Sequence, residues 1–164
     1  MFRLATSEDG DELAALAVLA YGGYLDQLDE PPAPMLLDYA VVAAAGRTHV
    51  AVWDGVIVAM VTVEEDGADL VLRNLAVLPS FQGRGIGRRM VEFAERLARE
   101  RGHRCIRLWT RVEMRANIDF YVALDYAVTH TERGGGANRI FFRKEIAPDP
   151  TIRTGGRVMN RSTQ

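Results

Sequence analysis

The spacing of hydrophobic and polar positions changes several times along the chain, and each change marks an expected element. Phe2 to Ala5 is typical of a short strand. A helix is predicted next, capped by Ser7 or Asp9 and ended by Gly22-Gly23. Its apolar face carries Leu13, Leu16, Ala17 and Ala20. A second short helix ended by Gly46 is expected to align Leu36, Leu37, Ala40, Val41 and Ala44 on one face.

The pattern then becomes extended. Two strands, His49 to Trp53 and Val56 to Val63, are predicted to form a hairpin across Asp54-Gly55. A third strand, Leu70 to Val77, follows a turn at Glu65-Asp66-Gly67. The expected elements after it are a helix from Gly87 to about Arg101, a strand from Cys105 to Thr110, a short helix from Arg115 to Leu124, and a closing hairpin of Tyr126 to Thr131 and Arg139 to Lys144 across Gly134-Gly135-Gly136. Because a helix joins them, the strands at Leu70 and Cys105 should be parallel.

Composition and charge narrow the class of protein. The 164 residues suit one domain, expected over residues 1–146, with a C-terminal tail over 147–164 that has no core pattern. A net charge of −2 predicts no general attraction to nucleic acid or to an anionic membrane. No signal peptide and no apolar stretch of about 20 residues is found, so a cytoplasmic location is expected. The scattered His49, His103 and His130 predict no metal site, and Cys105, in an apolar run, is expected to be a buried, inert thiol.

The stretch Leu75 to Arg89 carries the strongest chemical signal. Gly83, Gly85 and Gly87 alternate between the end of a strand and the start of a helix. Bare backbone amides and a helix N-terminus in this arrangement favour binding of an anion, and the neighbouring Arg84, Arg88 and Arg89 add positive charge. We therefore predict a pyrophosphate site; a plain glycine-rich turn is the alternative. A dinucleotide fingerprint would need glycine at Arg88, and no Gly-Lys-Ser/Thr phosphate loop is present.

The segment Gln82-Gly83-Arg84-Gly85-Ile86-Gly87 resembles the Q/R-x-x-G-x-G/A signature of the GNAT superfamily of N-acetyltransferases, and the predicted order of elements is also that of this family. The resemblance implies an α/β fold with a central, mostly antiparallel twisted sheet, one parallel splayed strand pair and flanking helices. It also implies transfer of an acetyl group from acetyl-CoA to a primary amine, on a small molecule or a peptide, by direct attack in a ternary complex.

The same resemblance assigns roles to individual residues. The backbone of Leu75 and Val77 would contact pantetheine in the gap between the splayed strands, with the Val77 N–H as oxyanion donor. Tyr121, at the end of Asn117-Ile118-Asp119-Phe120-Tyr121, would protonate the leaving thiolate, or else simply anchor a helix to the sheet. The residues expected to bind the cofactor are Leu75, Ala76, Val77, Gln82, Gly83, Arg84, Gly85, Ile86, Gly87, Arg88, Asn117 and Tyr121.

The sequence departs from the family pattern at three places. Many members have asparagine where Met114 stands here, and Asn117 is expected to take over its contact with pantetheine. The usual Leu-Gly-Phe is Leu124-Asp125-Tyr126, so the helix end has no glycine cap. Some members carry a carboxylate as general base in the strand where Val71 to Asn74 lie, and here there is none. Glu113, just after the next strand, is the candidate base; a water chain is the alternative.

The irregular loop from Tyr21 to Pro34 is expected to select the amine. Tyr21 and Tyr24 could pack against the acceptor, and Asp26, with Asp29 and Glu30, could attract its positive charge; an ordinary acidic surface is the alternative. The apolar Ile140-Phe141-Phe142 and the tail suggest a homodimer. Two functions from other classes fit the same residues: a non-catalytic acyl-CoA sensor, and an interaction domain on the same scaffold.

Overall fold

The computed structural model describes residues 1–135 and 138–147. Its single sheet has the strand order β1-β2-β3-β4-β5-β7-β6, and only β4 and β5 are parallel neighbours. The strands are β1 (Phe2–Leu4), β2 (Thr48–Trp53), β3 (Val56–Asp66), β4 (Asp69–Val77), β5 (Cys105–Arg111), β6 (Ala127–Glu132) and β7 (Arg139–Glu145). The mixed α/β class and the predicted order of elements are confirmed. The predicted turn residue Gly136 and the tail from 148 to 164 lie outside the described residues.

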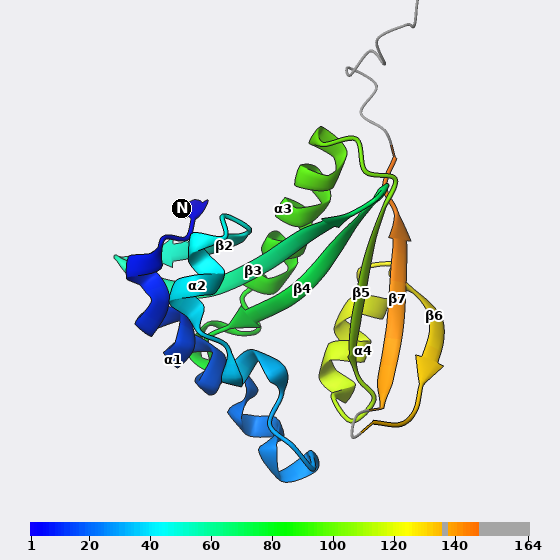
Figure 1. Ribbon diagram of the computed structural model, residues 1–164, viewed down its shortest axis with the longest axis horizontal. Coiled ribbons are helices and arrows are strands. Elements are labelled where there is room, and N and C mark those ends of the chain that lie inside the picture. The colour runs from blue at the N-terminus through cyan, green and yellow to red at the C-terminus, as the bar shows by residue number, and fades with distance from the viewer. Residues whose placement is uncertain (136–137, 148–164) are drawn as a thin grey trace, which may run out of the picture.

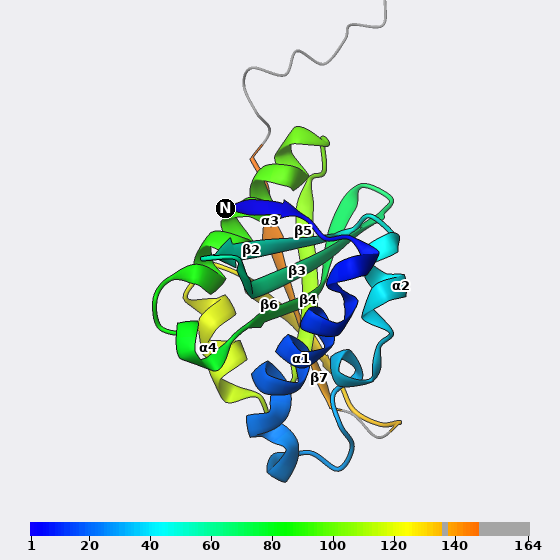
Figure 2. The ribbon, with the colours of Figure 1, turned by 90° about the vertical axis from the view of Figure 1, so that its left-hand side faces the viewer.

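Helices cover both faces of this sheet (Figures 1 and 2). One face carries α1 (Gly10–Tyr21) and α2 (Tyr39–Ala44), and the other carries α3 (Ile86–Glu100) and α4 (Arg115–Val122). Short 3₁₀ segments precede α1 (η1, Ser7–Asp9), link α1 to α2 (η2, Gly22–Gln27, and η3, Ala33–Leu36) and lead into the glycine loop (η4, Pro79–Phe81). The buried side chains accordingly form two clusters, one on each side of the sheet.

The second predicted helix is shorter than expected, and its predicted buried face was wrong. It begins only at Tyr39, because the Asp38 carboxylate accepts hydrogen bonds from the amides of Ala40 and Val41 (3.1 and 3.3 Å) and caps it. Its buried residues are Tyr39 and Ala43. The side chains of Leu36, Leu37 and Val41 are exposed.

The strand β4 contains a bulge that reverses the direction of its side chains. Thr62 of β3 pairs with Asn74 and the next residue, Val63, pairs with Leu72, so Arg73 is an extra residue on β4. A bulge re-aims the side chains that follow it. Leu72 therefore belongs to the core on the α3 side, whereas Asn74 is buried on the α1 side against Tyr39. This change of face was not predicted from the sequence.

Beyond the bulge, β4 and β5 separate. Their pairing covers only three positions, from Asp69 with Cys105 to Val71 with Arg107. Figure 1 shows the two strands together at the Asp69 end and diverging toward the Val77 end. The predicted splay of the parallel pair is confirmed, and it leaves a stretch of β4 without a neighbouring strand. On the far side of the gap lies β7, which carries one of the apolar residues that suggested a homodimer, Phe142. The side chain of Phe142 is buried in the core on the α3 side of the sheet.

Candidate active site

A single cleft of about 1150 Å³ occupies the splay and connects three parts of the chain. One end is the glycine loop with the start of α3. The middle lies between β4 and α4. The other end lies under the segment of residues 22–37, which we call the strap, and extends to β5 and β7. Residues from these three parts line the same cavity, among them Gly85, Leu75, Tyr121, Tyr24 and Arg111.

The glycine loop exposes backbone amides because its glycines take conformations that side chains disfavour. Gly83 and Gly85 have φ of +72° and +77°, in the left-handed region. Gly85 is the N-cap of α3, and its carbonyl accepts the N–H of Arg89 (3.1 Å). The amides of Ile86, Gly87 and Arg88 precede this first helical bond, so they are the amides that an α-helix leaves available at its N-terminus. Such an end binds anions.

Gly87 is needed for a different reason. Its backbone has ordinary helical geometry, but a Cβ there would lie 3.3 Å from Cζ of Phe120 and 3.7 Å from a methyl group of Val77. A hydrogen at this position therefore lets α3, α4 and the end of β4 approach closely.

The free edge of β4 presents the backbone of Leu75 and Val77 to the gap. The N–H of Leu78 donates to the Val58 carbonyl of β3 (2.9 Å), so the alternating peptides of Val77 and Leu75 point away from β3. Their carbonyls accept hydrogen bonds from outside the sheet: Leu75 O from the Tyr21 hydroxyl (3.0 Å) and Val77 O from Nε2 of Gln82 (3.1 Å). The Val77 N–H thus faces the cleft, where an oxyanion donor was predicted.

Tyr121 lies on α4 at the wall of the cleft. Its ring packs edge-on against Phe120 and Tyr126, with ring centroids 5.1 and 5.8 Å away. Burial raises the pKa of this phenol above its usual value, so the hydroxyl keeps its proton. Within the part of the chain that the structure describes, the hydroxyl has no hydrogen-bond partner, and it is available to a molecule in the cleft.

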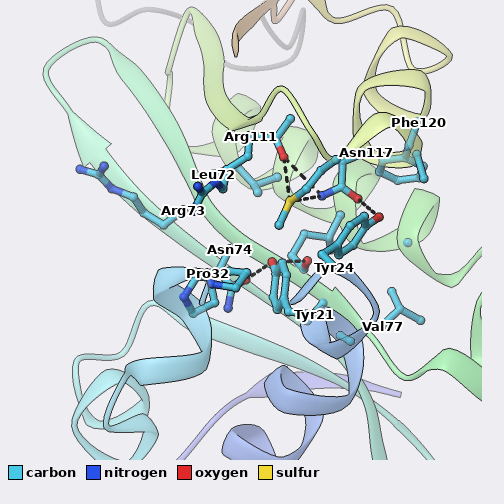
Figure 3. Close-up of a pocket in the computed structure, with 18 of the residues that line it drawn as sticks. Tyr21, Tyr24, Pro32, Leu72, Arg73, Asn74, Val77, Arg111, Asn117 and Phe120 are labelled. Carbon is cyan, nitrogen blue, oxygen red and sulfur yellow. Dashed lines mark hydrogen bonds between the residues drawn. The ribbon is translucent and has the colours of Figure 1, made fainter. Parts of the chain in front are cut away.

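Opposite Tyr121, a buried polar chain joins α1, β4 and α2. The Tyr21 hydroxyl donates to Oδ1 of Asn74 (2.7 Å), Nδ2 of Asn74 donates to the Tyr39 hydroxyl (3.1 Å), and Tyr39 donates to the Pro34 carbonyl (2.8 Å). The pKa of Tyr21 is raised, mainly by burial and then by the neighbouring phenols of Tyr121 and Tyr39. Figure 3 shows Tyr21 and Asn74 pointing toward each other at the floor of the cleft.

The strap contacts the far wall of the cleft through Tyr24 and Glu30. The Tyr24 hydroxyl donates to Oδ1 of Asn117 on α4 (3.4 Å), and Nη1 of Arg111 donates to the Glu30 carbonyl (3.4 Å). Figure 3 shows Tyr24 and Asn117 meeting from opposite elements. These contacts join the two sides of the sheet where β4 and β5 have separated.

The structure brings most of the predicted site residues into this cleft. Those that line it are Tyr21, Tyr24, Leu75, Ala76, Val77, Gln82, Gly83, Gly85, Gly87, Arg88, Asn117 and Tyr121. Arg84, whose guanidinium lies 5.1 Å from the Phe81 ring centroid, and Ile86, Asp26 and Glu113 are not among the lining residues. The carboxylate of Glu113 lies instead beside Nε of Arg111, at 3.8 Å.

The lining residues that were not predicted include Asn74, Trp109, Arg111 and Arg139. The position of Arg111 could have been predicted, because it is the last residue of β5, one of the two strands that separate. The place of Asn74 depends on the bulge, and that of Arg139 on the pairing of β5 with β7, neither of which local pattern reveals.

Across residues 1–135 and 138–147, no group of three or more His, Cys, Asp or Glu side chains is arranged to hold a metal ion. No helix in the same residues has the length and apolar character needed to cross a membrane. Cys105 is buried, and burial raises the pKa of its thiol to about 12.

This architecture is found in known proteins. A sequence model of the Acetyltransferase (GNAT) family matches residues 11–126. An uncharacterized N-acetyltransferase of Methanocaldococcus jannaschii is 35% identical over 63 residues, which cover 38% of this chain and 28% of that protein. The chain thus spans little more than a quarter of that curated relative.

Solved structures share the whole fold at low sequence identity. The ribosomal-protein-S18-alanine N-acetyltransferase of Escherichia coli superposes with a TM-score of 0.73 at 18% identity, covering 93% of this chain and 97% of its own. The PaiA N-acetyltransferase of Thermoplasma acidophilum, solved with coenzyme A, gives a TM-score of 0.74 at 16% identity, covering 88% and 98%. At such identities the likeness shows the fold alone.

Proposed function

This chain belongs to the acetyltransferase (GNAT) family, and we propose that it transfers the acetyl group of acetyl-CoA to a primary amine by direct attack in a ternary complex. One observation carries this proposal: a single cleft connects the glycine loop, the free edge of β4 and the hydroxyl of Tyr121, and then continues under the strap. A cofactor bound from the loop to Tyr121 would leave the strap end open for a second substrate.

The residues present fit coenzyme A. The amides around Gly85 and the N-terminus of α3 suit its pyrophosphate, with Arg88 beside them. The free edge of β4 at Leu75 and Val77 suits pantetheine, which carries amide groups that can pair with a strand edge. Acetyl-CoA supplies the activated acetyl thioester, and the chain supplies the positioning.

We assign the Val77 N–H to the oxyanion that forms at the thioester carbonyl, because it faces the gap and comes from a rigid strand. In the reaction a C–N bond forms, the C–S bond breaks, and the electron pair leaves with sulfur. Tyr121 donates its proton to that thiolate. The proton lost by the amine passes to water and restores the phenol, so the protons balance.

We propose water, rather than Glu113, as the acceptor of the amine's proton. Glu113 does not line the cleft, and its carboxylate lies beside Arg111. The lining carboxylates are Glu30 and Glu64, and Glu64 is held by Nε of Arg73 at 2.7 Å. An alkylammonium, with a pKa of about 10.4, would therefore have to reach the thioester in its neutral form.

The test is a thiol-release assay with acetyl-CoA and a panel of primary amines, combined with calorimetry of acetyl-CoA binding. We expect micromolar binding of the cofactor and amine-dependent release of free thiol, with the acetylated amine identified by mass. If acetyl-CoA binds but no amine in the panel becomes acetylated, the chain is a non-catalytic acyl-CoA sensor. If acetyl-CoA does not bind, the cofactor assignment is wrong.

A further inference from the structure

The strap end of the cleft is lined by more positive than negative side chains. Its charged lining residues are Arg73, Arg111, Arg139, Glu30 and Glu64. Of the three acidic residues that were expected to attract a cationic amine, Glu30 lines the cavity, whereas Asp26 and Asp29 do not. The charge in this region therefore differs from the charge of the loop sequence.

Two of these arginines lie directly opposite each other. Arg111 of β5 is the cross-strand partner of Arg139 of β7, which puts their Cβ atoms about 4.5–5.5 Å apart. Like charges opposite each other on one face of a sheet repel. Arg111 is 9% exposed, so solvent screens it only weakly. An anion between the two guanidinium groups would relieve this repulsion.

The guanidinium of Arg139 is also held in place. It lies 4.6 Å from the centroid of the Trp109 ring, which lines the same cavity. A stacked guanidinium keeps its fork of N–H donors free for a planar oxyanion. Within residues 1–135 and 138–147, Arg139 forms no ion pair with a carboxylate.

The carboxylates of Glu64 and Glu113 already lie beside arginines, whereas no ion pair is formed by the carboxylate of Glu30 within the residues that the structure describes. Glu64 lies between Arg73 (2.7 Å) and Arg47 (3.5 Å). Glu113 lies 3.8 Å from Nε of Arg111, and Glu30 contacts Arg111 through its backbone carbonyl rather than its carboxylate. One Arg111–Glu113 pair offsets part of the charge, and Arg139 remains as an additional positive group.

We infer that the acceptor is an amine that also carries an oxyanion, a carboxylate or a phosphate, held by Arg139 and Arg111 at the strap end of the cleft. This rests on the proposed function. The oxyanion fixes one end of the acceptor between β5 and β7. Its amine is then directed toward the gap between β4 and α4, where Val77 and Tyr121 lie. Selection of the acceptor thus depends on the paired strands β5 and β7 as well as on the strap.

The inference is tested with matched acceptors: the standard amino acids, their carboxamides, phosphoethanolamine, and the diamine putrescine. Carboxylate or phosphate acceptors are expected to exceed the carboxamides and putrescine in kcat/KM. Loss of a charge-assisted hydrogen bond in Arg139→Gln should lower kcat/KM for the preferred oxyanion acceptor by about 10- to 100-fold, mainly through KM. The amino-acid and phosphoethanolamine arms distinguish the two kinds of oxyanion.

Arg143→Gln is the matched control, because it removes the same charge from the same strand. Arg143 pairs with Glu145 (3.0 Å) and does not line the cleft, so its loss should leave kcat/KM unchanged. A binding measurement separates this inference from catalysis: N-acetyl amino acids and N-acetylphosphoethanolamine are titrated into the protein with coenzyme A, and Arg139→Gln should weaken the binding that is found.

Three outcomes would overturn the inference. In the first, the carboxamides or putrescine are acetylated with the same kcat/KM as the oxyanion acceptors. This result would leave the acetyltransferase function standing and contradict the oxyanion site. Wild-type selectivity in Arg139→Gln would do the same. If no acetyl transfer occurs and none of the acetylated oxyanions binds, the oxyanion site is wrong, whereas their Arg139-dependent binding without transfer would count against the catalytic proposal alone.

Discussion

The two ends of the cleft are built in different ways. The end that we propose for the cofactor consists largely of backbone: amides of the glycine loop, the N-terminus of α3 and the free edge of β4, all within residues 69–100. The end that we propose for the acceptor consists of side chains from the strap, β5 and β7, brought together from distant parts of the sequence. A backbone site needs particular glycines in a fixed spacing, so it leaves a motif. A side-chain site needs only that distant positions meet, and it leaves none.

The largest expected effect is at the cofactor end. Gly85→Val places a β-branched residue at φ +77° and misplaces the amides that begin α3. Losing two charge-assisted hydrogen bonds of about 1.5–3 kcal/mol each would weaken acetyl-CoA binding by roughly 10²-fold to more than 10⁴-fold, and so abolish measurable binding in calorimetry.

Gly102→Val is its control, since Gly102 has nearly the same φ (+75°) and follows the opposite end of the same helix. It should cost comparable stability and leave the affinity for acetyl-CoA unchanged. Wild-type affinity in a folded Gly85→Val protein would contradict the pyrophosphate site.

The next largest effect is expected at Tyr121, which lies between the two ends of the cleft. Tyr121→Phe keeps the ring packing and removes the proton donor, so the rate of the chemical step should fall by about 10²- to 10⁴-fold. The affinity for acetyl-CoA should change little, because the hydroxyl acts on a developing thiolate. Single-turnover kinetics measures this step directly.

Tyr126→Phe tests whether loss of any buried hydroxyl has the same result. Tyr126 is as buried as Tyr121, but its hydroxyl contacts Glu95 (3.3 Å) outside the cleft. This variant should transfer acetyl at nearly the wild-type rate. Equal rates for Tyr121→Phe and the wild type would return Tyr121 to a packing role.

The next effect is a dependence of the rate on pH, of about tenfold per pH unit. Burial raises the pKa of Tyr121 above the ordinary tyrosine value of about 10. The phenol therefore stays protonated at neutral pH and at mildly alkaline pH. Without a base in the cleft, kcat/KM for the acceptor should rise about tenfold per pH unit as the neutral amine becomes more abundant. Rates between pH 6 and 9.5 would show this slope, and Glu113→Gln should share it. A plateau at neutral pH that Glu113→Gln removes would restore Glu113 as the base.

The smallest effect is expected at the strap. Tyr24→Phe removes the long, half-buried hydrogen bond to Asn117 (3.4 Å), which links the strap to the far wall of the cleft. A bond of this kind contributes about 0.5–1.5 kcal/mol, so KM for the acceptor should rise by about 2- to 12-fold with the affinity for acetyl-CoA unchanged. An unchanged acceptor KM would show that the strap contact plays no part in holding the amine.

The difference between the ends also explains what the sequence could predict. The strands, the splay and helices α1, α3 and α4 follow from periodicity, the glycine motif and the family resemblance, whereas the start and the buried face of α2 do not. Asp125, where the pattern of the resembling family implies glycine, takes φ +65°, in the left-handed region that glycine favours. In contrast, Asn74 reaches the cleft only because of the bulge at Arg73, and Arg139 only because β7 inserts between β5 and β6. Both positions depend on the register between strands that are distant in the sequence, and the local pattern of residues does not reveal that register.

The most direct test of the central claim, that acetyl-CoA lies between the glycine loop and the free edge of β4, is an amide NMR titration with coenzyme A. The binding site proposed here predicts the largest shift changes at the amides of Gly83, Gly85, Gly87 and Val77, with the amide of Arg139 and the indole N–H of Trp109 nearly unmoved until an acceptor is added. Saturable binding with those glycine and Val77 amides unchanged, and with the large shifts elsewhere in the molecule, would contradict it.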